Sequence, residues 1–313
     1  MRSMASSGTG SSVNCRAANV VRMTSVISMT APTVNKSQSG VYVSIVEAIV
    51  LAIVQGLTEF LPISSSGHLV LARWLFGWED PGLDFDVAVH VGTLAAILFA
   101  FRREVWGVLK GLQADAGTVE GLRPRRLVWL GLIGTIPMVI VGGLLYETLQ
   151  DELRDATTAG AFLLATGAMI GGAEWRTRRR CDASPLVSLD ERRSLAIGIA
   201  QCLAILPGIS RSGMCMVAGM AMGQGREAAA RWAFWLSMPA LAGAGVLAVA
   251  ALIDGQESVD AAALTAGALV SFATALLAIR ALLWLVRGRS LIPFAGYCLV
   301  VGLAVLIARA AGA

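Results

Sequence analysis

Two short polar segments interrupt apolar stretches of the chain and hold most of the residues that could do chemistry. The first contains Gln55, Glu59, a serine run and His68. Gln55 and Glu59 are four residues apart, so a helix places both on one face. A carboxylate and an imidazole are costly at membrane depth unless they line a polar cavity. We therefore interpret this segment as a functional site; the alternative is a pair of structural polar groups that satisfy each other.

The second polar segment reads PGISRSG and carries Arg211 between two serines. Pro207 and Gly208 are expected to break a helix there and to free backbone amides. Those amides, the hydroxyl groups and a fixed guanidinium together suit a phosphate group. The alternative is an arginine whose side chain merely extends to the membrane surface.

The two polar segments are related by an internal repeat. A shift of 146 residues aligns residues 53–77 with 199–223, and nine of these 25 positions are identical. The serines and the glycine that follow each break coincide, and Arg211 falls on the position of Ser65. We expect two diverged copies of one helix–break–helix unit.

Composition places these segments in a membrane protein. The chain is 56% hydrophobic and 15% charged, with a mean hydropathy of +0.70, whereas a soluble protein of this length carries more charge. The net charge of +4 is too small to suggest nucleic-acid binding. We predict an all-α polytopic protein with re-entrant helical hairpins at 44–78 and 194–223. Six predicted transmembrane helices lie at 87–101, 127–146, 157–173, 232–253, 261–286 and 290–308.

Loop charges predict an inverted topology. Residues 102–126, 173–193 and 280–289 are rich in basic residues, whereas 79–86, 147–155 and 254–260 are acidic. Basic loops stay cytoplasmic, and six spans satisfy this alternation only if both hairpins enter and leave on one side. Each repeat (44–173 and 194–308) then holds one hairpin and three spans, so the second copy is inserted upside down. Such repeats place the working site near the bilayer midplane.

Two regions carry less information. Residues 1–40 are rich in Ser, Thr and Asn and contain no Asp or Glu, so we expect a disordered or mis-assigned N-terminal extension before a single membrane domain at 41–313. The five cysteines show no zinc-ligand spacing and are interpreted mostly as small buried hydrophobic residues. His90 is expected to be a packed, hydrogen-bonded histidine.

The strings QGLTEFLPISSSGH and PGISRSG resemble the undecaprenyl-diphosphate phosphatase family, also called the bacitracin-resistance family. FDVAVHVGTLAAIL and IPFAGY resemble it too, so the similarity covers about residues 44–308. The resemblance implies hydrolysis of undecaprenyl diphosphate to the monophosphate and inorganic phosphate, at the outer face of the cell membrane, with a divalent cation (Mg²⁺ or Ca²⁺). That reaction recycles the lipid carrier of cell-wall glycans.

The resemblance also implies roles for individual residues. The catalytic candidates are His68, Glu59, Ser65 and Arg211; the phosphate-binding candidates are Ser64, Ser66, Gly67, Ser210, Arg211, Ser212 and Gly213. Glu59 and Gln55 are the metal candidates, although many members of the family carry Glu at the position of Gln55. Three routes stay open: attack by Ser65 with His68 as its base, phosphorylation of His68, or activation of water by His68.

Two other functions are compatible with the pattern. The inverted repeat with broken helices also suits a transporter or flippase of polyprenyl phosphate. A proton-coupled carrier using Glu59 and His68 is a third option, which leaves Arg211 unexplained. The expected partners are the bilayer and a polyprenyl diphosphate, with no nucleic acid; a homodimer is left open.

Overall fold

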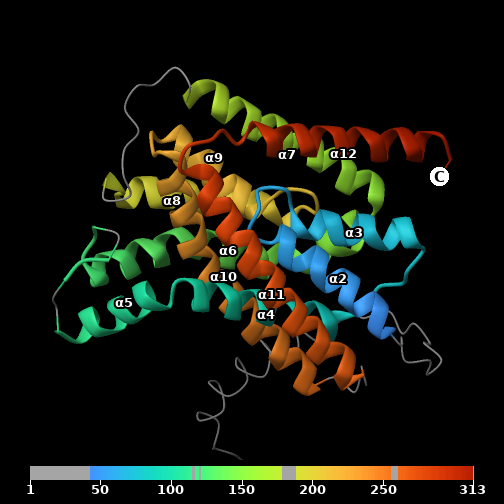
Figure 1. The fold of residues 1–313 in the computed structure, drawn as a ribbon, viewed down its shortest axis with the longest axis horizontal. Coiled ribbons are helices and arrows are strands. Elements are labelled where there is room, and N and C mark those ends of the chain that lie inside the picture. The colour runs from blue at the N-terminus through green and yellow to red at the C-terminus, as the bar shows by residue number, and fades with distance from the viewer. Residues whose placement is uncertain (1–42, 115–116, 120, 178–187, 255–259, 313) are drawn as a thin grey trace, which may run out of the picture. The chain divides into compact units, whose positions relative to one another are not determined.

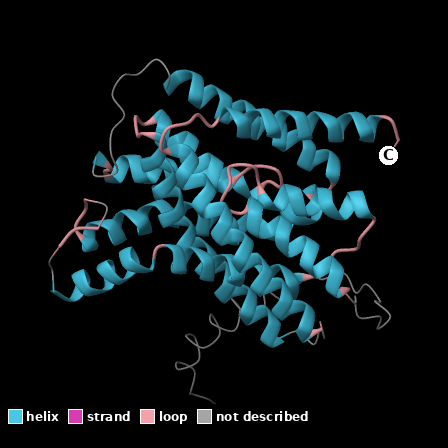
Figure 2. Cartoon of the chain, viewed as in Figure 1, coloured by secondary structure: helices cyan, strands magenta, loops and turns pink. Residues whose placement is uncertain are grey.

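The computed structural model describes residues 43–114, 117–119, 121–177, 188–254 and 260–312, and these form helices joined by short connections (Figures 1 and 2). The predicted extension at 1–40 lies outside the described residues. In chain order the helices are α2 (Ile45–Thr58), α3 (Ser65–Phe76), α4 (Leu83–Ala100), α5 (Arg102–Ala114), α6 (Pro124–Leu153), α7 (Ala156–Thr177), α8 (Glu191–Gln201), the 3₁₀ turn η2 (Cys202–Ile205), α9 (Arg211–Ala221), α10 (Arg226–Asp254), α11 (Ala261–Val286) and α12 (Ile292–Ala310).

The prediction of an all-α multi-pass membrane protein is confirmed for this part of the chain. Five helices are long and apolar enough to cross a bilayer: α4, residues 124–145 of α6, α7, α11 and α12. The first predicted span starts earlier than expected, because α4 begins at Leu83 rather than near residue 87. The remaining predicted span, 232–253, the fourth in chain order, falls within α10, which has 29 residues.

Both polar segments form a helix, a break and a second helix. Ser44 starts α2 with a capping box, in which its hydroxyl accepts from the Glu47 amide and the Glu47 carboxylate accepts from the Ser44 amide. The chain breaks over residues 59–64, and α3 then starts with Ser64 as its N-cap. The corresponding break in the second segment, at 206–210, precedes α9, whose N-cap is Ser210.

The two N-caps have the same local hydrogen bonds. The Ser64 hydroxyl accepts from the Gly67 amide at 3.3 Å, and the Ser210 hydroxyl accepts from the Gly213 amide at 3.1 Å. Ser64 has a φ of 70°, and it is the one non-glycine residue with positive φ in the described ranges. A side chain in this conformation costs about 1–3 kcal/mol, so the tertiary contacts of the break must hold Ser64 there.

The sequence predicts only a basic loop at 102–126, whereas the structure forms helix α5 at the start of this range. It begins directly after α4 and is amphipathic: Val105, Val108 and Leu112 recur at helical spacing and pack against the main core. Its other face carries exposed charge, including Arg103 and Lys110. The charges masked this periodicity when the segment was interpreted by composition alone.

Small residues allow the long helices to approach closely. Helix α12 packs along α7, and a Cβ atom added at Gly160 would lie 3.3 Å from the Gly302 carbonyl oxygen (Figure 1). Helix α11 packs against both α2 and α4, with Gly56 and Gly92 each facing Ser271. Close contact through small residues is the usual basis of helix packing in a bilayer.

An ion-pair cluster holds the end of α3. Arg73, on α3, pairs with Asp80 in the connection to α4, and Arg154 pairs with Asp80 at 3.3 Å and with Asp86 at 2.7 Å. Burial opposes ionisation of the Asp80 carboxyl, but the charges of Arg154 and Arg73 outweigh it and hold the pKa of Asp80 below its usual range. The Asp80 carboxylate therefore stays ionised at neutral pH, and the cluster ties α3 to the turn between α6 and α7.

Candidate active site

The breaks of the two polar segments contact each other. The Ser64 hydroxyl donates to the Ile209 carbonyl at 3.3 Å, and the Ser212 hydroxyl donates to the Leu61 carbonyl at 2.9 Å. A Cβ atom added at Gly67 would lie only 2.8 Å from the Gly208 Cα atom. The two connections, α2–α3 and α8–α9, can be followed to their meeting point in Figure 1.

Glu59 lies at the centre of this contact and is 8% exposed. Its Oε2 atom accepts from Gln55 Nε2 at 3.0 Å and from Ser65 Oγ at 2.6 Å. Its Oε1 atom pairs with Arg211 Nη2. A buried carboxylate needs partners of this kind, because an unpaired charge in a low-dielectric interior is strongly unfavourable. The predicted side-by-side placement of Gln55 and Glu59 is confirmed by their hydrogen bond.

Ser65 and Arg211 hold equivalent positions in the two repeats. Each is the first residue of its helix, directly after the N-cap serine. Each donates to a different oxygen of the same Glu59 carboxylate. The second repeat has Ile205 where the first has Glu59, so one carboxylate binds the first-turn residue of both repeats.

The remaining phosphate-binding candidates surround these first turns. Ser64 Oγ lies 3.3 Å from Ser66 Oγ, and Ser210 Oγ lies 3.1 Å from Ser212 Oγ. The first backbone amides of α3 and α9 lie at this cluster, beside the serine hydroxyls and Arg211. Amides at helix N-termini and a guanidinium are the donors that bind phosphate oxygens. The two predicted halves of the phosphate site therefore lie next to each other.

His68 lies beside this cluster and is fixed by two hydrogen bonds. Its Nδ1 atom is 2.7 Å from the Ser64 carbonyl oxygen, and its Nε2 atom is 2.8 Å from the Tyr297 hydroxyl. A carbonyl only accepts, so Nδ1 carries the proton and Nε2 accepts from the tyrosine when the ring is neutral. Within the described ranges, His68 makes no hydrogen bond to Ser65; the hydroxyl of Ser65 instead donates to Glu59.

Tyr297, on α12, is the partner of His68 that the sequence did not single out. Its ring lies nearly parallel to the imidazole, with an interplanar angle of 10° and a centroid separation of 5.5 Å. The position did offer a signal, since Tyr297 is a hydroxyl-bearing residue inside the predicted span 290–308. A tyrosine deep in a span is unusual, because this residue type favours the membrane interface.

Replacing Tyr297 by Phe is expected to lower kcat about 10-fold and to change KM less than twofold. The variant keeps the ring but removes the one hydrogen bond that orients Nε2, a loss of about 1–1.5 kcal/mol. Steady-state hydrolysis of a polyprenyl diphosphate by the purified chain, with the thermal midpoint measured in parallel, tests this. Phe294→Leu, on the same helix, is the control for altered packing. An unchanged kcat in Tyr297→Phe would show that the hydrogen bond does not orient a working His68.

The donor set near Glu59 fits a hard divalent cation. Gln55 Oε1 is buried and accepts no hydrogen bond from the residues that the structure describes, although Nε2 of the same amide donates to Glu59. This orphaned oxygen and the adjacent carboxylate are the ligand types that Mg²⁺ and Ca²⁺ prefer. The described ranges hold no group of three or more His, Cys, Asp or Glu residues suited to a metal. A cation here would take its other ligands from substrate phosphate and water.

The other histidine and the described cysteines are wholly or partly buried. His90 Nδ1 lies 2.6 Å from the Asp86 carbonyl oxygen, as expected for a packed histidine. Cys215 and Cys298 are buried and Cys202 is half-buried, all as free thiols. Cys15 and Cys181 lie outside the described residues.

Comparison with known proteins agrees with this geometry. A family model described as "Bacitracin resistance protein BacA" matches residues 48–304, a range that contains both polar segments and Tyr297. The chain belongs to the bacitracin resistance protein family. Among relatives in this family, the undecaprenyl-diphosphatase of Chromohalobacter salexigens is 42% identical over 259 residues, covering 83% of this chain and 97% of the relative. Undecaprenyl-diphosphatase 2 of Stutzerimonas stutzeri is 40% identical over 263 residues, covering 84% and 97%.

Proposed function

We propose that the chain is a membrane undecaprenyl-diphosphate phosphatase that releases inorganic phosphate from the lipid diphosphate and returns the lipid monophosphate. The observation that carries this is the Glu59 carboxylate bonded to Ser65 of one repeat and Arg211 of the other. These contacts place three groups in one cluster: the Ser65 hydroxyl, the Glu59 carboxylate as a proton acceptor, and the Arg211 guanidinium as a phosphate ligand. Relatives about 40% identical over most of the chain bear the name undecaprenyl-diphosphatase.

The hydrogen bond of Ser65 supports its assignment as nucleophile. Ser65 Oγ attacks the terminal phosphorus, its proton passes to Glu59 Oε2 at 2.6 Å, and the bond from phosphorus to the bridging oxygen breaks. The lipid monophosphate leaves, and a phosphoserine remains. Water then attacks the phosphoserine, the bond from phosphorus to Ser65 Oγ breaks, and Glu59 returns its proton to Ser65 Oγ. The proton of the water passes to the Tyr297 hydroxyl as that hydroxyl gives its own proton to His68 Nε2, and inorganic phosphate is released. Arg211 and the first-turn amides of α3 and α9 neutralise charge on the transferring group.

A divalent cation is part of this proposal. Glu59 and Gln55 Oε1 would hold it, and Mg²⁺ or Ca²⁺ bound there supplies further neutralisation of the diphosphate. Both oxygens of Glu59 accept hydrogen bonds from protein groups in this structure, so Arg211 must turn from Glu59 to phosphate when substrate enters.

We further propose six spans and two re-entrant hairpins in inverted orientation, with α10 as the fourth span and the site facing outward. The helix contacts support this arrangement because they come in equivalent pairs. Helix α2 packs on α11 as α8 packs on α6, and α4 packs on α11 as α10 packs on α6. The basic segments then lie on the cytoplasmic side. The same pairing is the observation that favours lipid translocation as a second candidate function.

Phosphate release tests the proposed function. The full chain, purified in detergent with Mg²⁺, is expected to release one equivalent of phosphate per undecaprenyl diphosphate, and Ser65→Ala is expected to be inactive. A wild-type chain that releases none with Mg²⁺ or Ca²⁺ would refute the phosphatase. Translocation of polyprenyl phosphate in proteoliposomes by Ser65→Ala would support the second function.

A further inference from the structure

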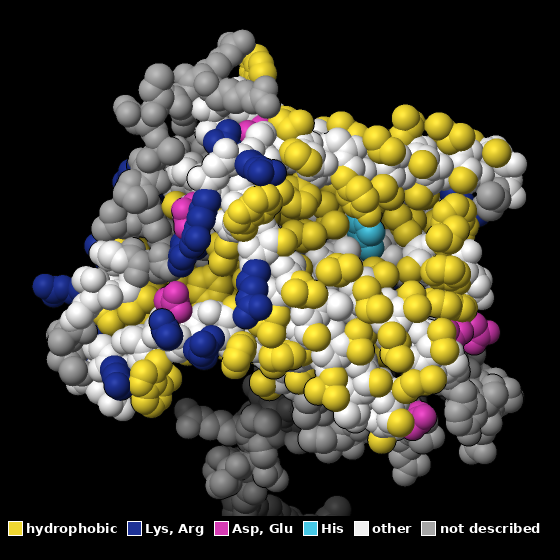
Figure 3. Space-filling model, viewed as in Figure 1, with side chains coloured by type: hydrophobic (Ala, Val, Ile, Leu, Met, Phe, Trp, Pro, Cys, Tyr) yellow, Lys and Arg dark blue, Asp and Glu magenta, His cyan; other side chains and the backbone are white. Residues whose placement is uncertain are grey.

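A cavity separate from the active site lies among the basic ends of four helices. It is lined by the end of α4, the start of α5, α10 and the C-terminal half of α11. Its lining contains neither Glu59 nor His68 nor Arg211. Part of its lining, including Arg102 and Arg280, belongs to the basic segments at 102–126 and 280–289, which the positive-inside rule assigns to the cytoplasmic side. Figure 3 shows Lys and Arg side chains gathered on one part of the surface, apart from the broad hydrophobic area.

The cavity has an excess of positive charge. Arg102, Arg231 and Arg280 line it, against the single acid Glu104. Arg231 is already engaged, since its Nε atom pairs with Glu227 at 3.4 Å and its guanidinium lies over the Phe101 ring. The other two arginines are therefore the ones that could bind an anion.

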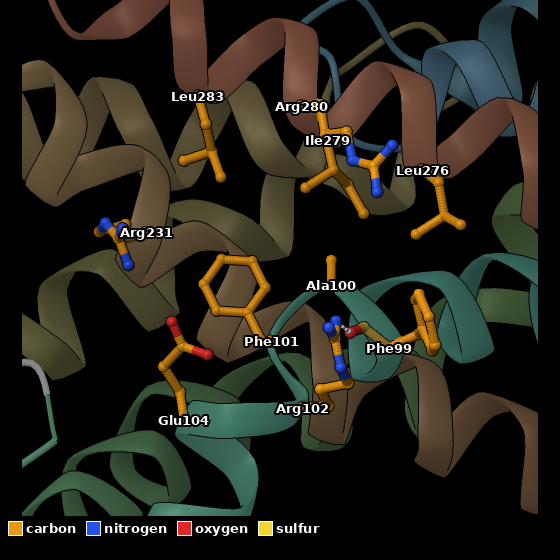
Figure 4. A pocket seen from close by; sticks show the side chains of 10 residues that line it. All are labelled: Phe99, Ala100, Phe101, Arg102, Glu104, Arg231, Leu276, Ile279, Arg280 and Leu283. Carbon is orange, nitrogen blue, oxygen red and sulfur yellow. Dashed lines mark hydrogen bonds between the residues drawn. The ribbon is translucent and has the colours of Figure 1, made fainter.

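Arg102 and Arg280 have few protein partners. Within the described part of the chain, Arg102 donates to the Phe99 carbonyl at 3.0 Å and lies over the Phe99 ring, but it has no acidic partner, and Arg280 has no hydrogen bond or ion pair. Their guanidinium groups reach toward the cavity from opposite walls (Figure 4). An ordered arginine that faces a cavity without an acidic partner favours an anion from outside the chain.

The rest of the cavity is apolar and continues onto a lipid-facing surface. Leu276, Ile279 and Leu283 form the α11 wall. Beside them on the same helix, Leu277 is 60% and Trp284 62% exposed. An occupant with a charged head and long apolar chains fits both parts: the head between the arginines and the chains along α11.

We propose that this cavity binds the head group of an anionic glycerophospholipid, with its phosphate between Arg102 and Arg280. Basic pockets between transmembrane helices on the cytoplasmic side are suited to such head groups. A chain of aromatic rings connects the cavity to the break between α2 and α3. Phe101 packs edge-on against Phe234, with ring centroids 5.7 Å apart, and Phe234 packs against Phe60, with ring centroids 5.6 Å apart. Phe60 is the residue after Glu59, so the lipid would support the packing beneath the active site.

Native mass spectrometry of the full chain tests this, with phosphatidylglycerol titrated against phosphatidylcholine of the same acyl chains. Wild type is expected to retain phosphatidylglycerol preferentially. The double variant Arg102→Gln/Arg280→Gln is expected to weaken its apparent affinity by about 10- to 30-fold, as about 1 kcal/mol for each basic residue implies. Arg103→Gln/Lys110→Gln removes the same charge from exposed positions of α5 outside the cavity, and should keep the wild-type affinity.

Three results would overturn the proposal. Equal retention of the two lipids by wild type would show that the chain binds lipids without selecting an anionic head group. An unchanged preference for phosphatidylglycerol in Arg102→Gln/Arg280→Gln would show that the anionic lipid binds at another site. An equal loss of affinity in both double variants would show that only the net charge of the chain matters. The readout is lipid binding, so it does not depend on hydrolysis of the diphosphate.

Discussion

Replacing Arg211 by Gln is expected to lower kcat/KM for undecaprenyl diphosphate about 1,000-fold. Arg211 is the cationic side chain bonded to the central Glu59 carboxylate, and in our proposal it turns to the transferring phosphate. Arginines that stabilise the charge of phosphoryl transfer contribute about 10³- to 10⁵-fold to the rate. Arg211→Lys keeps the charge but loses the planar fork, and should recover only part of the activity. Steady-state phosphate release by each purified variant provides the measurement.

Arg226→Gln is the matched control for this prediction. Arg226 pairs with the buried Glu174 through two bonds of 2.7 Å, at the junction of α7, α10 and α12. Both variants break a buried ion pair, and both should lower the thermal midpoint. Only Arg211→Gln should lose turnover per folded molecule. Loss of less than 10-fold in Arg211→Gln, or an equal loss in Arg226→Gln, would contradict the role of Arg211 at the phosphate.

Replacing Glu59 by Gln is expected to lower kcat about 1,000-fold. The change removes the acceptor of the Ser65 proton, and such proton transfers contribute about 10²- to 10⁴-fold. Ser65→Ala should lose at least as much. Because the two groups act in one step, the double variant should be no worse than the more severe single variant, within about threefold. The rates of the three variants, measured with saturating lipid and Mg²⁺, test this.

Glu191→Gln, an exposed acid at the start of α8, should leave these rates unchanged. Losses that multiply in the double variant would show that Ser65 and Glu59 work independently. Retention of phosphoserine formation in Glu59→Gln would instead assign the proton to another base, with His68 as the first candidate.

Much of the site could be predicted because its signals are local. Pro207 and Gly208 predicted a helix break, and the second segment is non-helical at 206–210. The i, i+4 spacing predicted that Gln55 and Glu59 share a face. The repeat predicted two equivalent breaks, and their exchange of hydrogen bonds brought Glu59 and Arg211 together.

The contacts that escaped prediction are between distant helices. Nothing in the sequence near His68 specifies Tyr297, which is 229 residues away and depends on how α12 packs. One of the three predicted routes pairs Ser65 with His68 as its base, because the two residues are neighbours in sequence. The turn of the break instead directs the Ser65 hydroxyl to Glu59. The sequence does not predict helix α5, because its apolar periodicity rests on only Val105, Val108 and Leu112 among many charged residues.

The shared carboxylate has a consequence for biogenesis. Residues 44–173 supply Glu59 and Ser65, and Arg211 is synthesised later, so a nascent chain that has inserted only its first half holds an unpaired buried acid. Hydrolytic competence then arises only when the second half has docked. A partly inserted chain would not cleave lipid diphosphates, because the Glu59 carboxylate would lack the cation that neutralises it.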